Sequence, residues 1–403
     1  DAAALQPLRT RLQWLEHQAR LALAEGDPRL ADWEARAAEV ERALLEQRRR
    51  LRIAAGDTAL PTGPGELDAA ALVAALPPRT ALVSWFLLDQ RWLACVAGAD
   101  GLRLVDGDAA GLAGELTQLR FQIDALRFGE ARLAGQLPRL VERARLRLQA
   151  VHRRLLAPLA PLLAGCERLV LLPHGPLNGL PFAALHDGRD YLIDRHDLSL
   201  APSAAVWLEV ARRAPRPMAR ALVAGHGEGL PQVAAEVAAV AAALGPGATL
   251  LCDGAATRAA VAAEAAEADL IHLACHGRFR ADSPAFSSLA LADGAWTLFD
   301  IEALRLRAEL VCLSACETAQ GELAPGDELV GLTRGFLLAG ASNVVSTLWT
   351  VGDDSCARLM ADLYARLGRG EAPAKALCAA QRALASLHPH PYHWAAYTLN
   401  GRG

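Results

Sequence analysis

Two apolar runs in the last third of the chain end in side chains that can do nucleophilic chemistry. The run 271–277 ends in His276 and Gly277, and the run 310–316 ends in Cys316. If the two runs are neighbouring parallel strands, His276 and Cys316 leave one sheet at its carboxyl edge, where open α/β sheets bind ligands. A thiol beside an imidazole at such an edge is the arrangement of a cysteine peptidase.

Each of these residue types has a definite role in peptide hydrolysis. A cysteine attacks as the thiolate, which a neighbouring histidine cation stabilises, so we interpret Cys316 as the nucleophile and His276 as the general acid and base. Backbone N–H groups must stabilise the oxyanion of the tetrahedral intermediate. Gly277 suits this task because a residue without a Cβ lets a substrate carbonyl approach its amide. The amide of Cys316 is the second expected donor.

The other cysteines and the other histidine of these runs are less suited to catalysis. Side chains alternate along a strand, so Cys275 points away from His276 and is expected in the core. Cys312 and His272 lie in the middle of their runs, too deep for a substrate to reach. The residues alone leave a second interpretation open, in which both runs are ordinary apolar core with incidental histidines.

Other kinds of site fit the sequence less well. Zinc ligands usually come in pairs spaced by two to four residues on loops, whereas these cysteines and histidines lie on predicted strands. We therefore expect no metal and no cofactor. The glycines within 225–229 form neither a dinucleotide fingerprint nor a P-loop, and no G-x-S-x-G elbow indicates a serine hydrolase.

Composition indicates a globular protein and gives no electrostatic reason to expect nucleic-acid binding. The 403 residues, 53% of them hydrophobic, suffice for two domains and an accessory segment, and the net charge of −4 offers no attraction for phosphates. The eight cysteines are scattered without a C-x-x-C pair, which favours a reducing compartment. No apolar stretch approaches the roughly 18 to 20 residues of a membrane span, and no positively charged start leads into a signal-peptide core. We expect a cytoplasmic protein without membrane contact, and a first residue Asp1 suggests a piece of a longer chain.

The amino-terminal part reads as a helical hairpin. Leucines and alanines recur at spacings of three and four between Leu5 and Ala22, and again between Trp33 and Leu44 after a Gly-Asp-Pro break. This pattern predicts a hairpin over 1–57 that serves for docking or repeat capping. The Gly- and Pro-containing stretch 58–75 is expected to be a linker.

Two α/β units are expected after the linker. Over 76–217 short apolar runs alternate with charged helical segments, and over 218–403 strands and helices alternate strongly, which favours a mostly parallel sheet covered on both faces. His174 also ends a predicted strand. No cysteine strand follows it at a matching place, so we interpret His174 as structural.

Five motifs, taken in order, resemble the signatures of the CHAT family, which belongs with caspases and separases among the caspase-fold cysteine peptidases. They lie at 272–277, 313–319, 326–328, 348–353 and 390–396. The resemblance covers about 76–403 and implies a caspase-like sheet flanked by helices, preceded by a related α/β domain without a dyad. It also implies a His276/Cys316 dyad that needs no third acid, and a hairpin left from a tetratricopeptide-type array.

The stretch 349–353 resembles the separase segment whose aspartate binds the basic residue before the cut. By this resemblance Asp353 would select Arg or Lys, because a carboxylate pairs with a cation and repels the Asp that caspases prefer. Trp349 would line the same pocket, although an aromatic residue there also suits the core. The alternative for Asp353 is a cap for the helix that follows.

Together these observations predict a cysteine endopeptidase that cleaves a protein partner after Arg or Lys and is regulated by partner binding. Some bacterial proteases that this chain resembles cleave gasdermin proteins, so a gasdermin-like effector is one expected substrate. The alternative from another class is a catalytically silent CHAT-type scaffold for protein–protein interaction.

Overall fold

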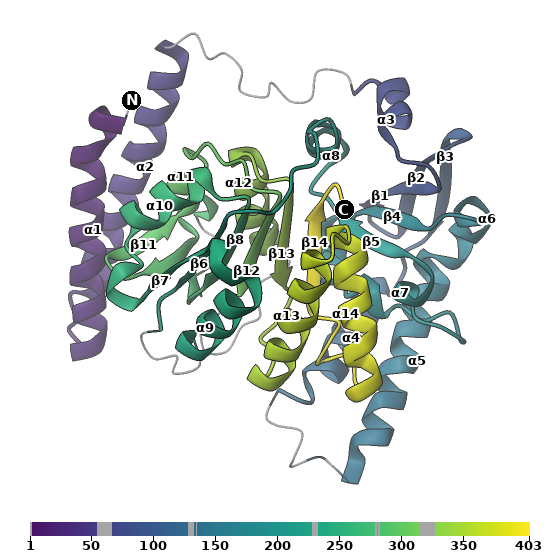
Figure 1. Ribbon diagram of the computed structural model, residues 1–403. Coiled ribbons are helices and arrows are strands. Elements are labelled where there is room, and N and C mark those ends of the chain that lie inside the picture. Colours follow the sequence, from purple (N-terminus) through teal and green to yellow (C-terminus); the bar gives the residue numbers. More distant parts are fainter. Residues whose placement is uncertain are drawn as a thin grey trace. The chain divides into compact units, whose positions relative to one another are not determined.

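The computed structural model describes residues 2–54, 67–127, 133, 135–227, 233–278, 280, 283–314 and 327–403. They fall into two compact units, Asp1–Leu67 and Asp68–Gly403, which we describe separately (Figure 1).

The first unit is the predicted helical hairpin. Helix α1 (Ala2–Glu25) packs against α2 (Leu30–Ala54) through the apolar stripe seen in the sequence, with Leu5, Leu12, Leu15, Ala22, Ala37, Val40 and Leu44 buried. The rings of Trp14 and Trp33 meet edge to face at 5.5 Å. In the turn, the carboxylate of Asp27 accepts hydrogen bonds from the amide and guanidinium of Arg29.

The second unit is built on one large sheet, in the order β3-β2-β1-β4-β5-β14-β13-β12-β8-β6-β7 for the strands that the structure describes. Its strands are β1 (Thr80–Leu88), β2 (Arg91–Gly98), β3 (Gly101–Asp108), β4 (Arg168–Leu172), β5 (Asp197–Leu200), β6 (Ala221–Gly225), β7 (Ala248–Cys252), β8 (Leu270–Ala274), β12 (Leu310–Ser314), β13 (Asn343–Thr347) and β14 (Tyr397–Gly401). A small antiparallel sheet contains β9 (Gly277–Arg278), β10 (Ser288–Leu291) and β11 (Gly294–Thr297).

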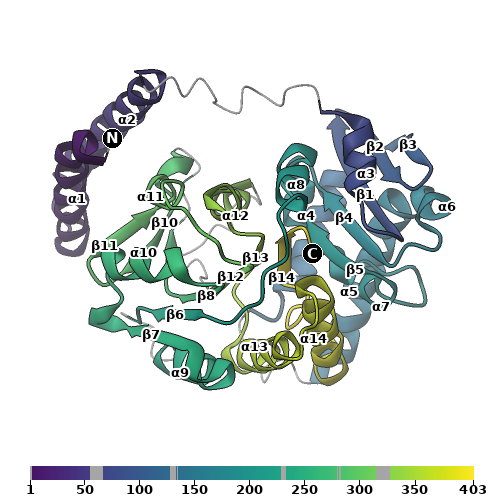
Figure 2. The ribbon, with the colours of Figure 1, turned by 45° about the horizontal axis from the view of Figure 1, so that its top comes forward.

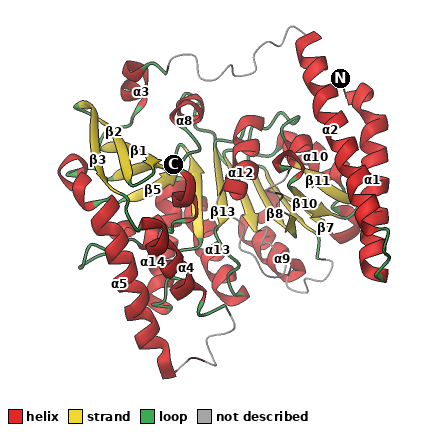
Figure 3. Ribbon diagram, turned by 180° about the vertical axis from the view of Figure 1, so that it is seen from behind, coloured by secondary structure: helices red, strands yellow, loops and turns green. Residues whose placement is uncertain are grey.

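Helices cover both faces of the large sheet (Figures 2 and 3). The core on one face includes residues of α4 (Leu112–Asp124), α5 (Leu137–Leu155), α9 (Val233–Leu244), α13 (Asp353–Gly368) and α14 (Pro373–Leu387). The cores on the other face include residues of α3 (Ala69–Ala75), α8 (Ala204–Ala211), α10 (Arg258–Glu267) and α12 (Asp327–Ala339). Three short helices complete the set, namely α6 (Ala160–Leu163), α7 (Leu192–Arg195) and α11 (Leu298–Ile301).

The pairing confirms the predicted mixed fold with a mainly parallel central sheet. Strands β1, β4 and β5 pair in parallel, as do β7, β6, β8, β12 and β13. The carboxyl-terminal strand β14 joins the two sets, because it pairs in parallel with β5 and antiparallel with β13. One sheet therefore runs across the boundary expected at 217/218, and the division into a non-catalytic and a catalytic domain stays a prediction.

Part of the expected linker is helical. Asp68 accepts a hydrogen bond from the amide of Ala70 at 2.9 Å and caps α3, and Leu72 of that helix is buried. The stretch 69–75 is too short to show the repeated apolar spacing from which a helix is predicted. It is ordered because it packs on the sheet through Leu72.

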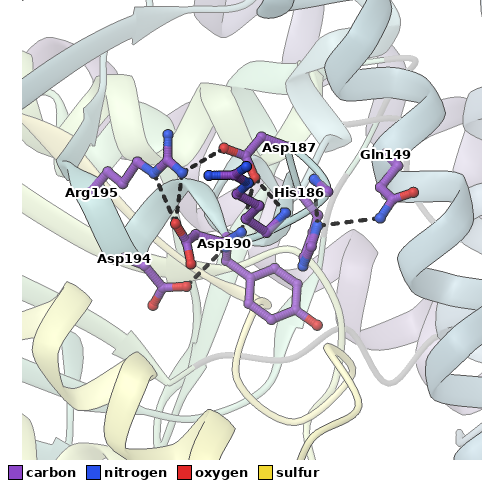
Figure 4. A network of polar contacts seen from close by, with 9 residues as sticks. Gln149, His186, Asp187, Asp190, Asp194 and Arg195 are labelled. Carbon is purple, nitrogen blue, oxygen red and sulfur yellow. Dashed lines mark hydrogen bonds and ion pairs between the residues drawn. The ribbon is translucent and has the colours of Figure 1, made fainter. Parts of the chain in front are cut away.

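A polar network holds the segment that leads into β5 (Figure 4). Arg195 bridges Asp187 at 2.8 Å and Asp190 at 2.7 Å. His186 Nδ1 accepts a hydrogen bond from the amide of Gly188 at 2.9 Å, and Asp194 accepts one from the amide of Tyr191. All these contacts join residues of the segment 186–195, so they stabilise the local conformation of that segment.

A buried ion pair ties the last strand to the strand that leads to the candidate nucleophile. Glu309 precedes β12 and pairs with Arg402, which follows β14, and their side chains are 6% and 11% exposed. Replacing Glu309 with alanine leaves the guanidinium of Arg402 without its counter-charge, so we expect a loss of about 3 kcal/mol in the free energy of unfolding. Urea denaturation of the wild type and of Glu309→Ala measures this difference in the free energy of unfolding. The exposed pair of Arg358 and Asp354 is the control, because Arg358→Ala should leave the unfolding midpoint nearly unchanged.

Candidate active site

Strands β8 and β12 are parallel neighbours, as the hypothesis of a shared site requires. Cys312 lies opposite His272, and Ser314 opposite Ala274, at the carboxyl ends of the two strands. His276 comes two residues after Ala274 in the sequence, and Cys316 comes two residues after Ser314. The register thus ends the two strands at the same level of one sheet edge. Cys316 itself lies outside the described residues.

Gly277 has a backbone orientation that suits an oxyanion donor. The amide of Ala290 donates to the carbonyl of His276 at 2.8 Å, and Gly277 lies opposite Leu289. This makes Gly277 and Leu289 a non-hydrogen-bonded pair, in which both N–H groups point away from the partner strand. The amide of Gly277 is therefore not used in pairing with β10. His276 itself is half-buried.

The other cysteines of the two runs cannot serve as thiolates. Cys275 and Cys312 are 3% and 0% exposed, and burial raises the pKa of each thiol to about 12. The structure thereby confirms that Cys275 is a core residue and that Cys312 is out of reach of a substrate. Burial also raises the pKa of Cys252, the half-buried residue that ends β7.

The sequence profile of the CHAT domain matches residues 145–402. The chain belongs to the CHAT family. The CHAT match confirms the resemblance drawn from the five motifs, and it includes β8, β12 and the first turn of α13. No helix among the described residues of this CHAT protein is long and apolar enough to cross a membrane.

Relatives of the CHAT protein include the mouse protein "Tetratricopeptide repeat protein 28", which is 36% identical over 107 residues, that is 26% of this chain and 4% of the mouse protein. Among solved structures, the separase–securin complex of Saccharomyces cerevisiae aligns with a TM-score of 0.58 and 10% identity, over 82% of this chain and 30% of the yeast chain. The Arg-specific cysteine proteinase gingipain R aligns over 64% of this chain and 67% of that chain, with a TM-score of 0.41 and 10% identity. This chain thus spans a small part of the first two proteins, and the separase likeness supports the caspase-type fold.

The predicted specificity residues lie on the segment that follows β13. Trp349 is half-buried, and its indole Nε1 donates to the carbonyl of Tyr392 at 2.9 Å. The hydroxyl of Tyr392 donates to the carbonyl of Thr350 at 2.8 Å, so this segment is anchored at two points. Asp353 is the first residue of α13 and Gly352 occupies the N-cap position, so Asp353 is not the N-cap residue. The side chain of Asp353 lies outside what the structure describes.

Two aromatic residues near the carboxyl terminus belong to the core. Trp394 and Tyr397 are 0% and 2% exposed. His174, interpreted from the sequence as structural, accepts a hydrogen bond from the amide of Leu87 at 3.2 Å, and its ring centroid lies 4.4 Å from that of Phe86 with the rings tilted by 37°. These contacts brace the end of β1, as the interpretation requires.

A polar cluster lies under the carboxyl edge of β8 and β12, with its histidine buried and its carboxylate half-buried, and the sequence did not reveal it. His272 Nδ1 lies 2.7 Å from the hydroxyl of Tyr364, and His272 Nε2 lies 3.4 Å from a carboxylate oxygen of Glu236. Ser314 and Cys356 also contact this group. The only sequence signal was a histidine in the middle of an apolar strand. No group of three or more His, Cys, Asp or Glu in the described ranges could hold a metal ion.

The histidine-rich motif near the carboxyl terminus makes stability depend on pH. Burial, with a smaller effect of the neighbouring His393, lowers the pKa of His390 to about 4, whereas an unfolded histidine titrates near 6.5. The unfolded chain therefore binds more protons between these values. The contribution of neutral His390 is fully present above pH 6.5, and about 3 kcal/mol is lost as pH falls to about 4.

Urea unfolding at several pH values between 7 and 4 measures this effect. We expect the wild type to lose stability more steeply than His390→Gln, whose amide does not titrate. Parallel pH curves for the two proteins would show that His390 is not the group responsible.

Proposed function

We propose that this CHAT protein is a cysteine endopeptidase in which Cys316 is the nucleophile, His276 the general acid and base, and the amides of Gly277 and Cys316 the oxyanion donors. The observation that carries the proposal is the register of β8 and β12, which ends both strands at one level two residues before His276 and Cys316. The N–H of Gly277, which points away from β10, also supports the proposal.

The proposed reaction has two steps. The thiolate of Cys316 attacks the carbonyl carbon, a C–S bond forms, and the carbonyl oxygen takes the negative charge. When this intermediate collapses the C–N bond breaks, and the imidazolium of His276 gives its proton to the leaving amine. Water, deprotonated by His276, then hydrolyses the thioester and releases the new carboxyl terminus and the thiol.

The proposed substrates are proteins cut after Arg or Lys. Asp353 and Trp349 are the proposed walls of the pocket for that residue, and the anchoring of 349–350 by Tyr392 supports a preformed pocket. The yeast neighbour was solved as a complex of separase with securin, so control by a bound partner is part of the proposal. Gasdermin-like effectors and a cytoplasmic location remain predictions from the sequence.

Sequencing of new chain termini tests this function. The protein is incubated with a lysate of its source cells, and the new amino termini are compared with those produced by the Cys316→Ala variant. We expect new termini preceded by Arg or Lys only with the wild type. Identical termini in both samples would favour the silent scaffold instead.

A further inference from the structure

Helix α5 carries a row of arginines on its exposed side. Four of its arginines are exposed, and none of these forms an ion pair with another described residue: Arg139, Arg143, Arg147 and Arg153. At 3.6 residues per turn, the four side chains lie within about a third of the helix circumference. We call this side of α5 the arginine face.

The opposite side of α5 belongs to the core. Leu148, Val151 and Leu155 are buried there. The helix packs on α4 and lies at the outside of the second unit (Figures 1 and 3). The arginine face is therefore turned away from the sheet and is open to a partner.

The carboxylates carried by α5 and α4 close to these arginines already have partners. Glu142 of α5 pairs with Arg145 at 2.7 Å. Glu115 of α4 pairs with Arg154 at 3.1 Å. Neither Arg145 nor Arg154 belongs to the arginine face, so the positive charge of that face is not matched by these two glutamates.

An exposed leucine lies among the arginines. Leu146 is 51% exposed and follows Arg143 by three residues, so the two side chains are neighbours on the helix surface. The half-buried Ala150 comes four residues later on the same side. An apolar strip bordered by charged side chains is the pattern by which one helix packs along another.

We propose that the arginine face binds an acidic helix of a protein partner. Arg139 and Arg153 are about 21 Å apart along the helix axis, which is about four turns. Carboxylates at every fourth residue of a partner helix recur at the same interval, about 6 Å, as Arg139, Arg143 and Arg147, and can pair with them. Leu146 then contacts an apolar side chain of the partner. This inference goes beyond the proposed function and does not depend on the catalytic residues.

Other anionic partners fit the arginine face less well. Helix α5 contains no Phe, Tyr or Trp on which a nucleic-acid base could stack. The net charge of −4 opposes the approach of a long polyanion, whereas a short acidic helix covers α5 alone. The apolar side of α5 is buried in the core, so the helix cannot insert that side into a membrane.

Fluorescence anisotropy at low ionic strength tests the proposal with a labelled, alanine-based helical peptide of about 20 residues. The peptide has glutamates at every fourth position and one central leucine, and it has no Arg or Lys at which the proposed peptidase would cut. We expect Arg143→Gln/Arg147→Gln to weaken binding about tenfold, because each exposed ion pair contributes about threefold. Leu146→Ala should weaken it about threefold through the lost apolar contact.

Two controls separate a built surface from general charge. Arg212→Gln/Arg334→Gln removes two exposed arginines from elsewhere in the second unit and should bind the peptide like the wild type. A peptide of the same composition, with its glutamates spread around the helix, should bind the wild type about tenfold more weakly than the first peptide. Glutamine is a good helix former, so the variants should keep the wild-type unfolding midpoint.

Three results would overturn the inference. The first is that the wild type does not bind the peptide, and the second is that it binds no more tightly than Arg143→Gln/Arg147→Gln. The third is that the same arginines bind a single-stranded RNA, or vesicles containing phosphatidylserine, more tightly than the peptide. None of these results bears on the peptidase proposal, because the measurement involves no cleavage.

Discussion

Replacing Cys316 with alanine is expected to lower kcat for peptide cleavage by about 10⁴-fold or more, and His276→Ala by a similar factor. Without the sulfur no covalent intermediate forms, and without the imidazole the thiolate is not stabilised and the leaving amine receives no proton. Because the two residues act as a unit, the double variant should be hardly worse than either single variant. The measurement is steady-state cleavage of a fluorogenic peptide with Arg before the cut.

Cys252→Ala is the matched control for the nucleophile. Cys252 is the last residue of β7, and Cys316 follows the end of β12 in the sequence. Cys252 is half-buried, and burial raises the pKa of its thiol. We expect Cys252→Ala to retain the wild-type rate. A Cys316→Ala protein with wild-type kcat would rule out Cys316 as the nucleophile, whatever the other variants show.

The second large effect concerns the residue before the cut. Asp353→Asn is expected to lower kcat/KM for peptides with Arg or Lys at that position by about 10³-fold, equivalent to about 4 kcal/mol, because a substrate cation then enters the pocket without its counter-charge. Peptides with an uncharged residue at that position should lose nothing. A peptide library that varies only this residue measures the change in preference.

Asp354→Asn is the control for this variant. Asp354 is the next residue along α13, it is exposed, and it forms an ion pair with Arg358 at 2.9 Å. It has the same charge at nearly the same place in the sequence, so its replacement should leave the preference for Arg and Lys unchanged. If both variants lost the preference equally, the effect would come from the general charge of the helix start rather than from a pocket.

Local sequence patterns were sufficient for most of the longer helices and strands of the second unit. Within the alternation of strands and helices predicted over 218–403, the apolar run 269–274 contains β8, Leu270–Ala274, and the alanine-rich stretch before it forms α10, Arg258–Glu267. Buried strands have continuous apolar runs bounded by polar turns, and helices have a period of three to four, so each element has its own local pattern. The short strands β5, β9 to β11 and β14 lacked such a pattern and were not foreseen.

The sequence by itself determined which residues could do chemistry and on which strand ends they lie, because motif spacing and strand alternation are local properties. Only the tertiary structure decided that β14 joins the two sets of parallel strands into one sheet, and that Glu236 reaches His272 and Ser314. Glu236 precedes His272 by more than thirty residues. Their contact depends on how closely α9 docks on β6, and no local periodicity records which two elements meet.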